Sequence, residues 1–581
     1  MFVKVTTSGP RRYVQLVESF RDEAGLVKKR TVATLGRLDQ LGGELDSVID
    51  GLMRVCARKP LDTQDKEPAS VVFESARALG NVWALTELWN ELGFSDLRRV
   101  FRRTRHTTDV QALVRIMVLN RLCDPDSKLG VLRWLQTVAL PDIEVPGVTH
   151  QQLLGSMDAL MEQQDAVDGV VSGLLRPMVD MDLSVVFYDM TTIRAEGLST
   201  QSADVRKFGM AKEGLIARQF MLGVVQTAEG LPIYHEVFDG NTAETKTLLP
   251  TLAKVMQRSP HIRRLVLVAD RALLSLENLK ALQAIRLGTD NDNDKGKGKD
   301  QPLEFILAVP GRRYHEFADL LGPFQKQCAQ ATHESTGEVA WNGMRLVMAH
   351  DPATAQEQSL ARKTKMDELE QLAATWTGKL EGQDQGQVKC GRKLCDSGTK
   401  ARFYHEVCEA RLSRILKVDM LKVDMPGELF SYAIDDQALK LAQMMDGKLL
   451  LVTNVPDMNP EQVIARYKSL ADIERGFKVL KSELEIGPVY HRLPDRIRAH
   501  ASICFMALVL HRVMRMRLRA ANSGLTPQRA LQSLKRIQHH RVSLNGAEPL
   551  SGVSSMTDED SHMLKALKVK QPTANRQLSL L

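Results

Sequence analysis

The chain has 581 residues, enough for several domains, and its 43% hydrophobic and 26% charged residues are ordinary for a soluble globular protein. Seven scattered cysteines do not suggest a disulfide framework, and the first residues lack the apolar core of a signal peptide. The most apolar run, Ile503–Leu510, is too short to span a bilayer, which takes about 20 residues. We therefore expect a reducing, cytoplasmic compartment and no membrane partner.

The net charge of +7 is modest, and its distribution is more informative than its size. Residues 461–520 contain twelve Lys or Arg against six Asp or Glu, so this one window holds most of the positive excess. A concentrated positive charge is the electrostatic footprint expected of a protein that binds nucleic acid.

Residues 1–60 are predicted to be rich in β structure. Arg12–Ser19 and Lys29–Leu35 roughly alternate polar and apolar residues, and Ala24 and Gly25 between them indicate a hairpin. From residue 70 to 180 the apolar spacing becomes three and four, which predicts a helical region. This region carries a basic cluster that is either a solvated face or a helix that contacts DNA: Arg98, Arg99, Arg102, Arg103 and Arg105.

Residues 181–290 alternate strand and helix patterns, which predicts a mixed α/β sheet. The predicted strands are Leu183–Asp189, Phe220–Val225, Ile233–Phe238 and Leu265–Asp270, and the predicted helices lie near Thr245–Gln257 and Ser275–Ile285. Gly288–Gln301 is polar and of low complexity, so we expect a mobile loop there.

Residues 291–455 are predicted to form a mostly β segment. The strand candidates are Phe305–Val309, Val339–Ala349, Phe403–Val407, Leu429–Ile434 and Leu449–Thr453. Residues 456–520 follow as a helical segment, and residues 521–581 are expected to be a weakly ordered tail apart from a basic helix after Pro527.

The stretch Tyr467–Lys481 reads as one helix. Tyr467, Glu474 and Lys481 are seven residues apart, close to two turns, so their side chains share one face. Beside this face lies an apolar stripe, formed by Ile473, Phe477 and Leu480. A simple alternative is a solvated face on which Glu474 pairs with Lys478.

Two aspartates, Asp189 and Asp270, each end an apolar strand pattern. Functional groups of an open α/β sheet gather beyond the carboxyl ends of its strands. Together with Glu474, the two aspartates could present three carboxylates to Mg²⁺, which prefers oxygen ligands; Mn²⁺ is a reasonable substitute. Two such ions about 4 Å apart can support an in-line phosphoryl displacement. The alternative is that each Asp is an ordinary turn or capping residue.

These residues resemble the motifs of bacterial insertion-sequence transposases of the DDE class, in the group with a Tyr-x2-Arg-x3-Glu-x6-Lys signature. Tyr467, Glu474 and Lys481 match this spacing, whereas the Arg position is Leu470. Tyr188–Thr192 and Val268–Ala272 resemble the motifs of the first and second Asp, although Ala272 stands where Gly is usual. Phe238–Thr242 and Ser482–Arg492 resemble two further motifs of the group.

The resemblance implies an RNase H-like catalytic core with residues 181–290 as its first part and residues 456–520, which contain the signature helix, as its second. A mostly β insertion, residues 291–455, separates the two parts between the second Asp and the Glu. The resemblance also implies that Asp189, Asp270 and Glu474 bind the metal ions, and that the protein cuts the ends of its element and joins them to target DNA. The residues implied to contact DNA are Tyr467 and Lys481, followed by Arg475, Lys478, His491 and Arg492. The N-terminal and helical regions are expected to help recognise the ends, and a homodimer on DNA is expected because two ends must be joined.

Three alternatives remain open at this stage. The same carboxylates would serve a nuclease without strand transfer, and the departures at Leu470 and Ala272 would suit an inactive DNA-binding copy. Cys390, Cys395, His405 and Cys408 could form a zinc module, but their spacing fits the usual paired ligands poorly. The chain contains no Gly-x4-Gly-Lys-Ser/Thr motif, so we do not expect an ATP-driven step.

Overall fold

The computed structural model describes most of the chain. The described residues are 1–23, 25–40, 47, 49, 53, 55–56, 71–102, 107–143, 147–178, 184–197, 201, 203–210, 216–258, 264–271, 276–287, 301–328, 332–386, 396–418, 432–544 and 546–572. The chain divides into two compact units, residues 1–74 with 542–550 and residues 75–541 with 551–581. The expected loop at 288–301 lies outside the described residues, except for Gln301.

The N-terminal unit contains a three-stranded antiparallel sheet of β1 (Phe2–Ser8), β2 (Arg11–Arg21) and β3 (Val27–Arg37). The predicted hairpin is confirmed as β2–β3, in which Gly25 takes the positive φ of 77° that a tight turn demands. The sequence analysis missed β1, which pairs with β2 from Phe2↔Val17 to Ser8↔Arg11.

The predicted helical region is confirmed, with one strand at its start. Strand β4 (Val71–Ala78) joins a small sheet with β18 (Gln538–Leu544) and β19 (Leu550–Val553), in the order β19-β18-β4. The helices that follow are α2 (Gly80–Leu92), α3 (Leu97–Phe101), α4 (Val110–Cys123), α5 (Lys128–Leu135), α6 (His150–Glu162) and α7 (Gln164–Leu175), with short 3₁₀ helices at Phe94–Asp96 and Arg176–Met178. In the basic cluster, Arg98 pairs with Asp109 and Arg99 with Asp96, while Arg103 and Arg105 lie outside the described residues.

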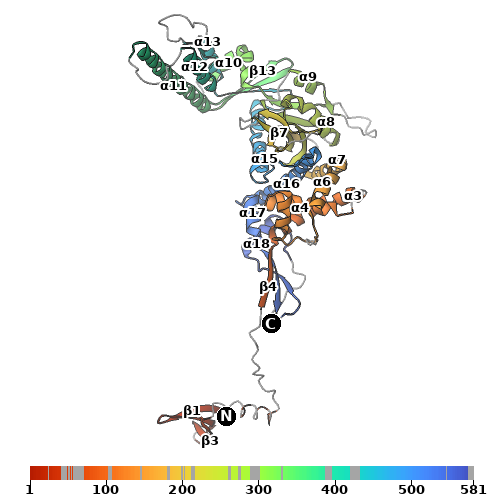
Figure 1. Cartoon of the computed structure of the whole chain (residues 1–581), viewed down its shortest axis with the longest axis vertical. Helices are drawn as coiled ribbons and strands as arrows, with labels where there is room; N and C mark the ends of the chain where they lie inside the picture. The colour runs from red at the N-terminus through yellow and green to blue at the C-terminus, as the bar shows by residue number, and fades with distance from the viewer. Residues whose placement is uncertain are drawn as a thin grey trace. The chain divides into compact units, whose positions relative to one another are not determined.

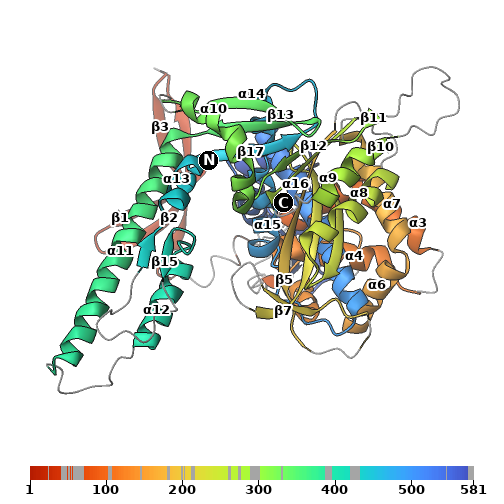
Figure 2. The same cartoon turned by 90° about the horizontal axis from the view of Figure 1, so that it is seen from above.

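A nine-stranded mixed sheet forms the centre of the second unit (Figures 1 and 2). Its path is β13-β14-β17-β12-β9-β5-β7-β6, and β8 pairs with the free part of the β7 edge. The strands are β5 (Ser184–Arg194), β6 (Lys207–Met210), β7 (Ile216–Thr227), β8 (Pro232–Asp239), β9 (Leu265–Ala269), β12 (Glu304–Ala308), β13 (Ser335–Trp341), β14 (Met344–His350) and β17 (Lys448–Thr453). Strands β5, β9 and β12 are parallel, and the other pairings are antiparallel.

Alternate side chains of the central strands enter two different cores, as the two-residue period of a strand requires. In β5, Val185 and Phe187 belong to one core, while Val186 and Tyr188 belong to the other. The first core is completed by α4, α6, α15 (Ala471–Ser482) and α16 (Pro494–Ala520). The second is completed by α8 (Leu248–Arg258), α9 (Leu276–Ala284) and α10 (Ala318–Cys328). We call these the α16 face and the α8 face of the sheet.

The description of residues 291–455 as mostly β is wrong. Strand β12, near the start of this segment, pairs with β9 at the centre of the sheet and is not an insertion. The remainder includes α11 (Pro352–Asp384), a helix of 33 residues, together with α12 (Asp396–Glu409) and α13 (Asp436–Met445). Helices α11 and α12 run side by side (Figure 2), with a small core of their own and the hairpin β15 (Leu416–Val418) and β16 (Tyr432–Ile434). Two short strands, β10 (Arg286–Leu287) and β11 (Gln301–Pro302), pair before β12.

Two strand predictions in this segment are corrected. Phe403–Val407 is part of helix α12, because Phe403 and Val407, four residues apart, bury one helical face against α11. The run Val339–Ala349 is two strands, β13 and β14, joined by Asn342 and Gly343. Both turn residues have positive φ (48° and 73°), as an Asn-Gly hairpin turn requires.

The last 60 residues are not a weakly ordered tail up to residue 572. Helices α17 (Pro527–Leu534) and α18 (Asp558–Ala566) are capped by Thr526 and Thr557. Their apolar residues join the same core as α16, including Leu531, Leu534, Met563 and Leu564. The apolar run Ile503–Leu510 lies in α16, the one helix among the described residues that is long and apolar enough to cross a membrane. Because 94% of its most apolar window is buried inside the protein, α16 is a core helix.

Candidate active site

Asp189 and Asp270 lie on neighbouring parallel strands, next to each other. Strands β5 and β9 pair in register as far as Tyr188↔Ala269, so the next residues on the two strands are the two aspartates. Neighbouring strands are about 4.8 Å apart. Side chains alternate between the two sides of a strand, so both aspartates point to the same side of the sheet as Phe187 and Val268. These two residues belong to the core on the α16 face.

Asp189 does not end its strand, contrary to the sequence analysis. Strand β5 continues to Arg194 and stays paired with β7, because Thr191 and Thr192 are β-branched and buried and extend the ladder. Only the pairing with β9 stops before Asp189, which opens the sheet beside this carboxylate. Asp189 is half-buried, and its Oδ1 accepts a 2.7 Å hydrogen bond from the main-chain N–H of Met190.

Tyr467 reaches the second carboxylate directly. Its hydroxyl donates a 3.1 Å hydrogen bond to Oδ1 of Asp270. Burial and the neighbouring carboxylate raise the pKa of the Tyr467 phenol, so the hydroxyl keeps its proton and remains a donor at neutral pH. In this structure Tyr467 therefore orients a candidate metal ligand.

The stretch Tyr467–Lys481 is two helices and not one, which corrects the sequence analysis. Helix α14 (Pro460–Lys468) ends where the Leu470 N–H bonds to the carbonyl of Tyr467 at three-residue spacing. The Ser469 hydroxyl also bonds to the carbonyl of Ala465, a contact that bends helices. Helix α15 then begins at Ala471 and contains positions 474 and 481.

Helix α15 packs one face onto the sheet. Phe477 and Leu480 are buried in the core on the α16 face, as predicted. Gly476 allows a close approach, since a Cβ there would lie 2.7 Å from Nε2 of Gln226 on β7. Arg475 and Lys478 are exposed on the opposite side, and Lys481 is half-buried. The side chains of Glu474 and Ile473 lie outside the described part of the structure.

The loop after α15 is held by buried side chains from two other helices. Arg121 of α4 donates from Nη1 to the carbonyls of Leu484 and Glu485, at 3.3 and 3.2 Å. Nε2 of His500, on α16, lies 2.9 Å from the carbonyl of Ile486. These contacts fix the end of the helix that carries Glu474.

The same loop is fastened to the end of β5. Val489 bonds through its N–H to Arg194 and through its carbonyl to Glu196, as an added strand would. Arg206 donates to the carbonyls of His491 and Arg492, and its guanidinium is fully buried against Asp204. Burial acts to raise the pKa of Asp204, but hydrogen bonds from Arg206 outweigh it and hold this pKa below its usual range.

His491 is not placed as a cation. Its imidazole is half-buried, and burial together with nearby Lys128 and Arg496 lowers its pKa to about 3, so it is neutral at pH 7. Arg492, by contrast, is exposed. Part of the basic window at 461–520 serves internal ion pairs, since Arg496 pairs with Asp158 and Arg517 with Glu91. The exposed basic residues of this window include Arg475, Lys478 and Arg492.

The donor set suits a hard divalent cation. Two adjacent carboxylates on a rigid sheet offer the oxygen ligands that Mg²⁺ and Mn²⁺ accept. Among the described side chains no group of three His, Cys, Asp or Glu could hold a metal ion, and the third predicted ligand, Glu474, is not one of them. For the zinc alternative, Cys390 and Cys395 are likewise outside the described residues, and Cys408 is an exposed free thiol on α12.

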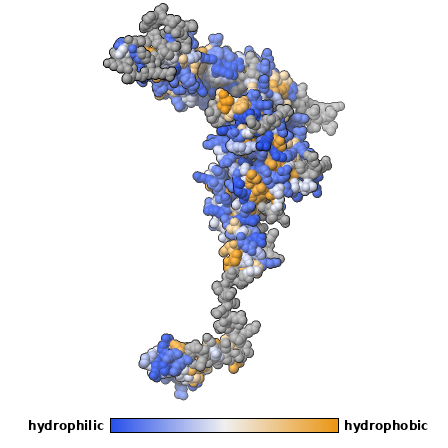
Figure 3. All heavy atoms as spheres, viewed as in Figure 1, coloured by the Kyte–Doolittle hydropathy of each residue, from blue (hydrophilic) through white to orange (hydrophobic). Residues whose placement is uncertain are grey.

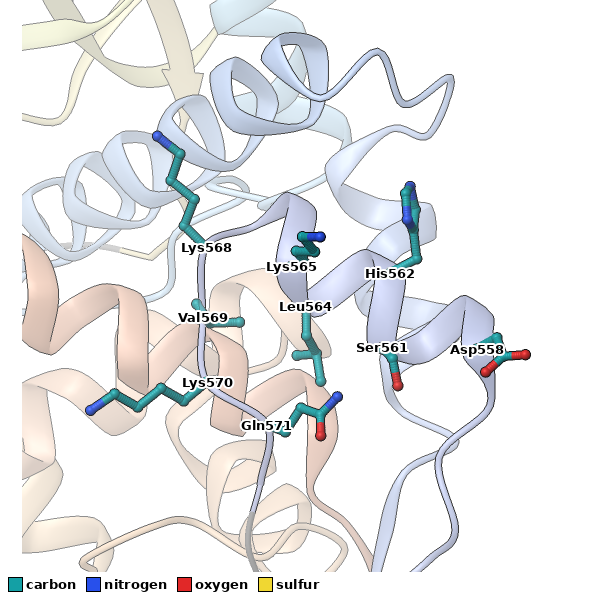
Figure 4. A pocket seen from close by; sticks show the side chains of 9 residues that line it. All are labelled: Asp558, Ser561, His562, Leu564, Lys565, Lys568, Val569, Lys570 and Gln571. Carbon is teal, nitrogen blue, oxygen red and sulfur yellow. The ribbon is translucent and has the colours of Figure 1, made fainter.

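A hollow of about 590 Å³ lies elsewhere, against α18 and residues 568–571. Figure 4 shows that the lysines Lys565, Lys568 and Lys570 around it point apart and do not converge on a common centre. None of the three predicted carboxylates lines it, so it is not the catalytic site.

Two regions of the chain match known transposase domains. Residues 180–510, more than half of the chain, match the transposase DDE domain. The chain belongs to the DDE transposase family. Residues 3–66 match the N-terminal domain of the IS1634 family transposases, and no curated protein matches the chain significantly. The transposase is thus a metal-dependent enzyme that acts on DNA, as the sequence analysis predicted.

The sequence analysis of the transposase missed three residues of this site. Arg121, Arg206 and His500 all act on main-chain carbonyls around α15. No spacing rule connects them with the carboxylates, because they come from separate elements. The only available signal was an arginine inside an apolar helical pattern, Arg121 in α4, which requires a buried partner.

Proposed function

We propose that the transposase cuts DNA at the ends of an insertion sequence and joins the freed 3′ ends to target DNA, with Asp189, Asp270 and Glu474 as ligands of Mg²⁺ or Mn²⁺. The observation that carries this proposal is the β5–β9 register, which sets Asp189 beside Asp270 on the sheet face that α15 covers. Helix α15 packs against β5 and carries the third carboxylate.

The sheet order supports an RNase H-like core. Strands β8, β7 and β5 form an antiparallel arrangement; β9 then pairs parallel with β5, and β12 pairs parallel with β9. The proposed core consists of residues 184–308 and 448–520. The hairpin β13–β14 and helices α11 and α12 are inserted between β12 and β17. The assignment to the Tyr-x2-Arg-x3-Glu-x6-Lys group belongs to the proposal as well.

Each residue near the carboxylates has a separate role in the proposed reaction. Asp189, Asp270 and Glu474 would hold the divalent ions, which would supply activation of the attacking oxygen and stabilisation of the leaving oxygen in an in-line displacement. Tyr467 keeps Asp270 in a fixed orientation. Arg475, Lys478, Lys481 and Arg492 contact phosphates near the cut, where positive charge positions DNA without reading its sequence. His491 contributes only its main-chain carbonyl.

The proposal also covers the assembly of the protein, its energy source, the recognition of the ends and its location. The protein works as a homodimer on DNA because both ends of the element must be cut and joined together, and it needs no ATP. Its N-terminal and helical regions help to recognise the element's ends. We place it in the cytoplasm, at the nucleoid.

A labelled duplex that carries one end of the element tests the proposal in Mg²⁺ and in Mn²⁺. We expect the wild type to nick the end and, with a target duplex present, to form a joined product. Glu474→Gln and Asp189→Asn should bind the duplex and not cut it, because each removes a metal-binding charge while keeping the shape. Nicking without any joined product would favour the nuclease alternative. Binding without nicking by the wild type would favour an inactive copy, and equal nicking by Glu474→Gln would mean that Glu474 is not the third ligand.

A further inference from the structure

The two faces of the N-terminal sheet differ in charge. Cross-strand pairing assigns each residue to a face, because paired residues point to the same side. Two side-chain contacts agree with this assignment on one face: Gln15 bonds to Thr34 at 3.2 Å, and Lys29 lies 5.4 Å from the ring centre of Phe2. On the other face Arg30 bonds to Glu18.

One face carries cations and no carboxylate at any strand position. Its strand residues include Lys4 on β1, Arg11 and Arg21 on β2, and Lys29 on β3, all of which are exposed. We call this set of four the cationic face. None of the four forms an ion pair within the described part of the chain. The row between Lys4 and Lys29 contains Phe2, Val17 and Thr31, and the rows towards Arg11 contain Tyr13 and Gln15.

The opposite face is of a different kind. It holds the apolar Val3, Val5 and Leu16, and of its strand cations Arg12, Lys28 and Arg30 the last two are paired with acids. Arg30 pairs with Glu18 at 3.0 Å and Lys28 with Asp22 at 2.9 Å. In Figure 3 the described part of this unit, at the lower end, shows a hydrophilic area beside smaller hydrophobic ones. Only one side of the sheet therefore carries strand cations with no carboxylate among them.

We propose that the cationic face binds the phosphate backbone of duplex DNA at the element's ends. This inference rests on the proposed function and specifies which surface of the N-terminal unit takes the DNA. Arg11 and Arg21 lie ten residues apart on β2, about 33 Å along a strand, so the positive charge follows the whole length of the sheet. Lys4 and Lys29 lie on the two outer strands, about 10 Å apart across the sheet and, because they pair with Gln15 and Ser19, about 13 Å apart along it. The major groove is about 12 Å wide and admits β-ribbons, so the outer cations can reach the phosphates that border it.

Two triple variants of the full-length protein test this surface with equal loss of charge. The first changes Lys4, Arg11 and Lys29 to Gln on the cationic face, and the control changes Arg12, Lys28 and Arg30 to Gln on the other. The probe is the labelled end duplex, titrated at several salt concentrations. We expect the first variant to bind at least tenfold more weakly and to lose about three from the slope of log affinity against log salt, about one for each lost phosphate contact. The control should stay within about twofold of the wild type, because two of its three cations are already paired with acids.

A charge-preserving variant separates lost charge from lost folding. Lys4→Arg, Arg11→Lys and Lys29→Arg together should bind like the wild type. Equal weakening by both Gln variants, or wild-type binding by the first, would overturn the proposal, as would weak binding by the charge-preserving variant. Asp189→Asn distinguishes this result from a failure of the proposed function, because it should bind normally without nicking. At saturating concentration the first Gln variant should still nick the duplex.

Discussion

Tyr467 shows how a single side chain connects α14 to the carboxylates. The family resemblance assigns this position to DNA contact, whereas in the structure its hydroxyl donates to Asp270. A protonated phenol that is half-buried and held by a carboxylate has little freedom to serve a phosphate at the same time. We therefore interpret Tyr467 as a positioning residue for Asp270.

Tyr467→Phe removes this hydrogen bond and keeps the aromatic ring in the core. We expect nicking to fall about tenfold, the effect of losing roughly 1.4 kcal/mol of orientation. The Mg²⁺ concentration for half-maximal nicking should rise, and affinity for the end duplex should not change. Metal titrations and binding assays on the same preparation measure both quantities. A loss of affinity for the end duplex with an unchanged Mg²⁺ dependence would mean that Tyr467 contacts DNA and does not orient Asp270.

The buried pair Asp204–Arg206 predicts a pH dependence of stability. The folded-state pKa of Asp204 lies below its usual range, so the carboxylate stabilises the fold fully above the unfolded pKa of about 3.9. This contribution is lost as the pH falls through the lower, folded-state pKa. Asp204→Asn should destabilise by about 3 kcal/mol at pH 7, because it leaves Arg206 buried without a charge partner.

Thermal unfolding of Asp204→Asn and the wild type, from neutral pH down to pH 3, measures this difference. The gap between their unfolding midpoints should be widest above about pH 5 and should narrow below about pH 4. Asp126→Asn is a suitable control, since that carboxylate also has a lowered pKa but lies at an exposed ion pair. A gap that widens on acidification would contradict the assignment.

At the scale of single elements, contacts from other parts of the chain stabilise α15 more than its own capping residues do. It has no side-chain cap at its N-terminus, and its C-terminal loop contains Glu485 with a positive φ of 47°. Such a backbone persists only where its surroundings hold it. Arg121, which bonds to the carbonyls of residues 484 and 485, is one of the groups that do so.

Arg121→Met should therefore affect catalysis beyond its effect on stability. The matched control is Arg115→Met, because Arg115 lies on the same helix, is also buried, and donates to a carbonyl away from α15, that of Pro141. Each change removes a buried hydrogen-bond donor and should cost about 1–3 kcal/mol of stability. At a temperature where both variants are folded, we expect only Arg121→Met to nick about tenfold more slowly, with end-duplex binding unchanged. Equal nicking by the two variants would show that Arg121 is structural only.

The strands of the core could be predicted from sequence because their signal is local. Leu265–Asp270 and Leu449–Thr453 are short apolar runs, and both became strands of the central sheet. The strand-end positions of Asp189 and Asp270 and the family motifs both suggested one site, but the register that sets the two side by side depends on contacts between distant segments. The strand prediction for Phe403–Val407 was wrong because a short apolar run does not distinguish a strand from a helix that is buried against a partner.

The predicted domain boundary at residue 291 was wrong for a different reason. The polar stretch Gly288–Gln301 around it indicated the end of a domain, but the chain after that stretch forms β12, which pairs with β9 in the central sheet. A crossover of this kind leaves no mark on the residues that make it. The break between α14 and α15 was equally hidden, since Ser469 and Leu470 fit a continuous helical pattern and only the structure shows the shortened turn.

At the scale of the whole molecule, the C-terminal segment belongs to the helical core. Leu531 and Leu534 on α17 and Leu564 on α18 are buried in the core that α16 completes. The side chain of Trp83, on α2, donates to the carbonyl of Lys570 at 2.8 Å. Residues from both ends of the second unit therefore stabilise α16, and through it the face of the sheet that carries the candidate site.

Two truncations test this dependence. Ending the chain after Asn522 removes α17 and α18 and exposes their apolar partners, and each large buried side chain lost is worth about 1.5–3 kcal/mol. We expect this protein to unfold at a temperature at least 10 °C lower, or to aggregate, and to lose nicking together with stability. Ending the chain after Pro572 keeps every described contact and should leave the unfolding midpoint and nicking unchanged. If the shorter protein melted and nicked like the wild type, α16 and the site would be independent of the C-terminal helices, and the burial of Leu531, Leu534 and Leu564 would serve only those helices.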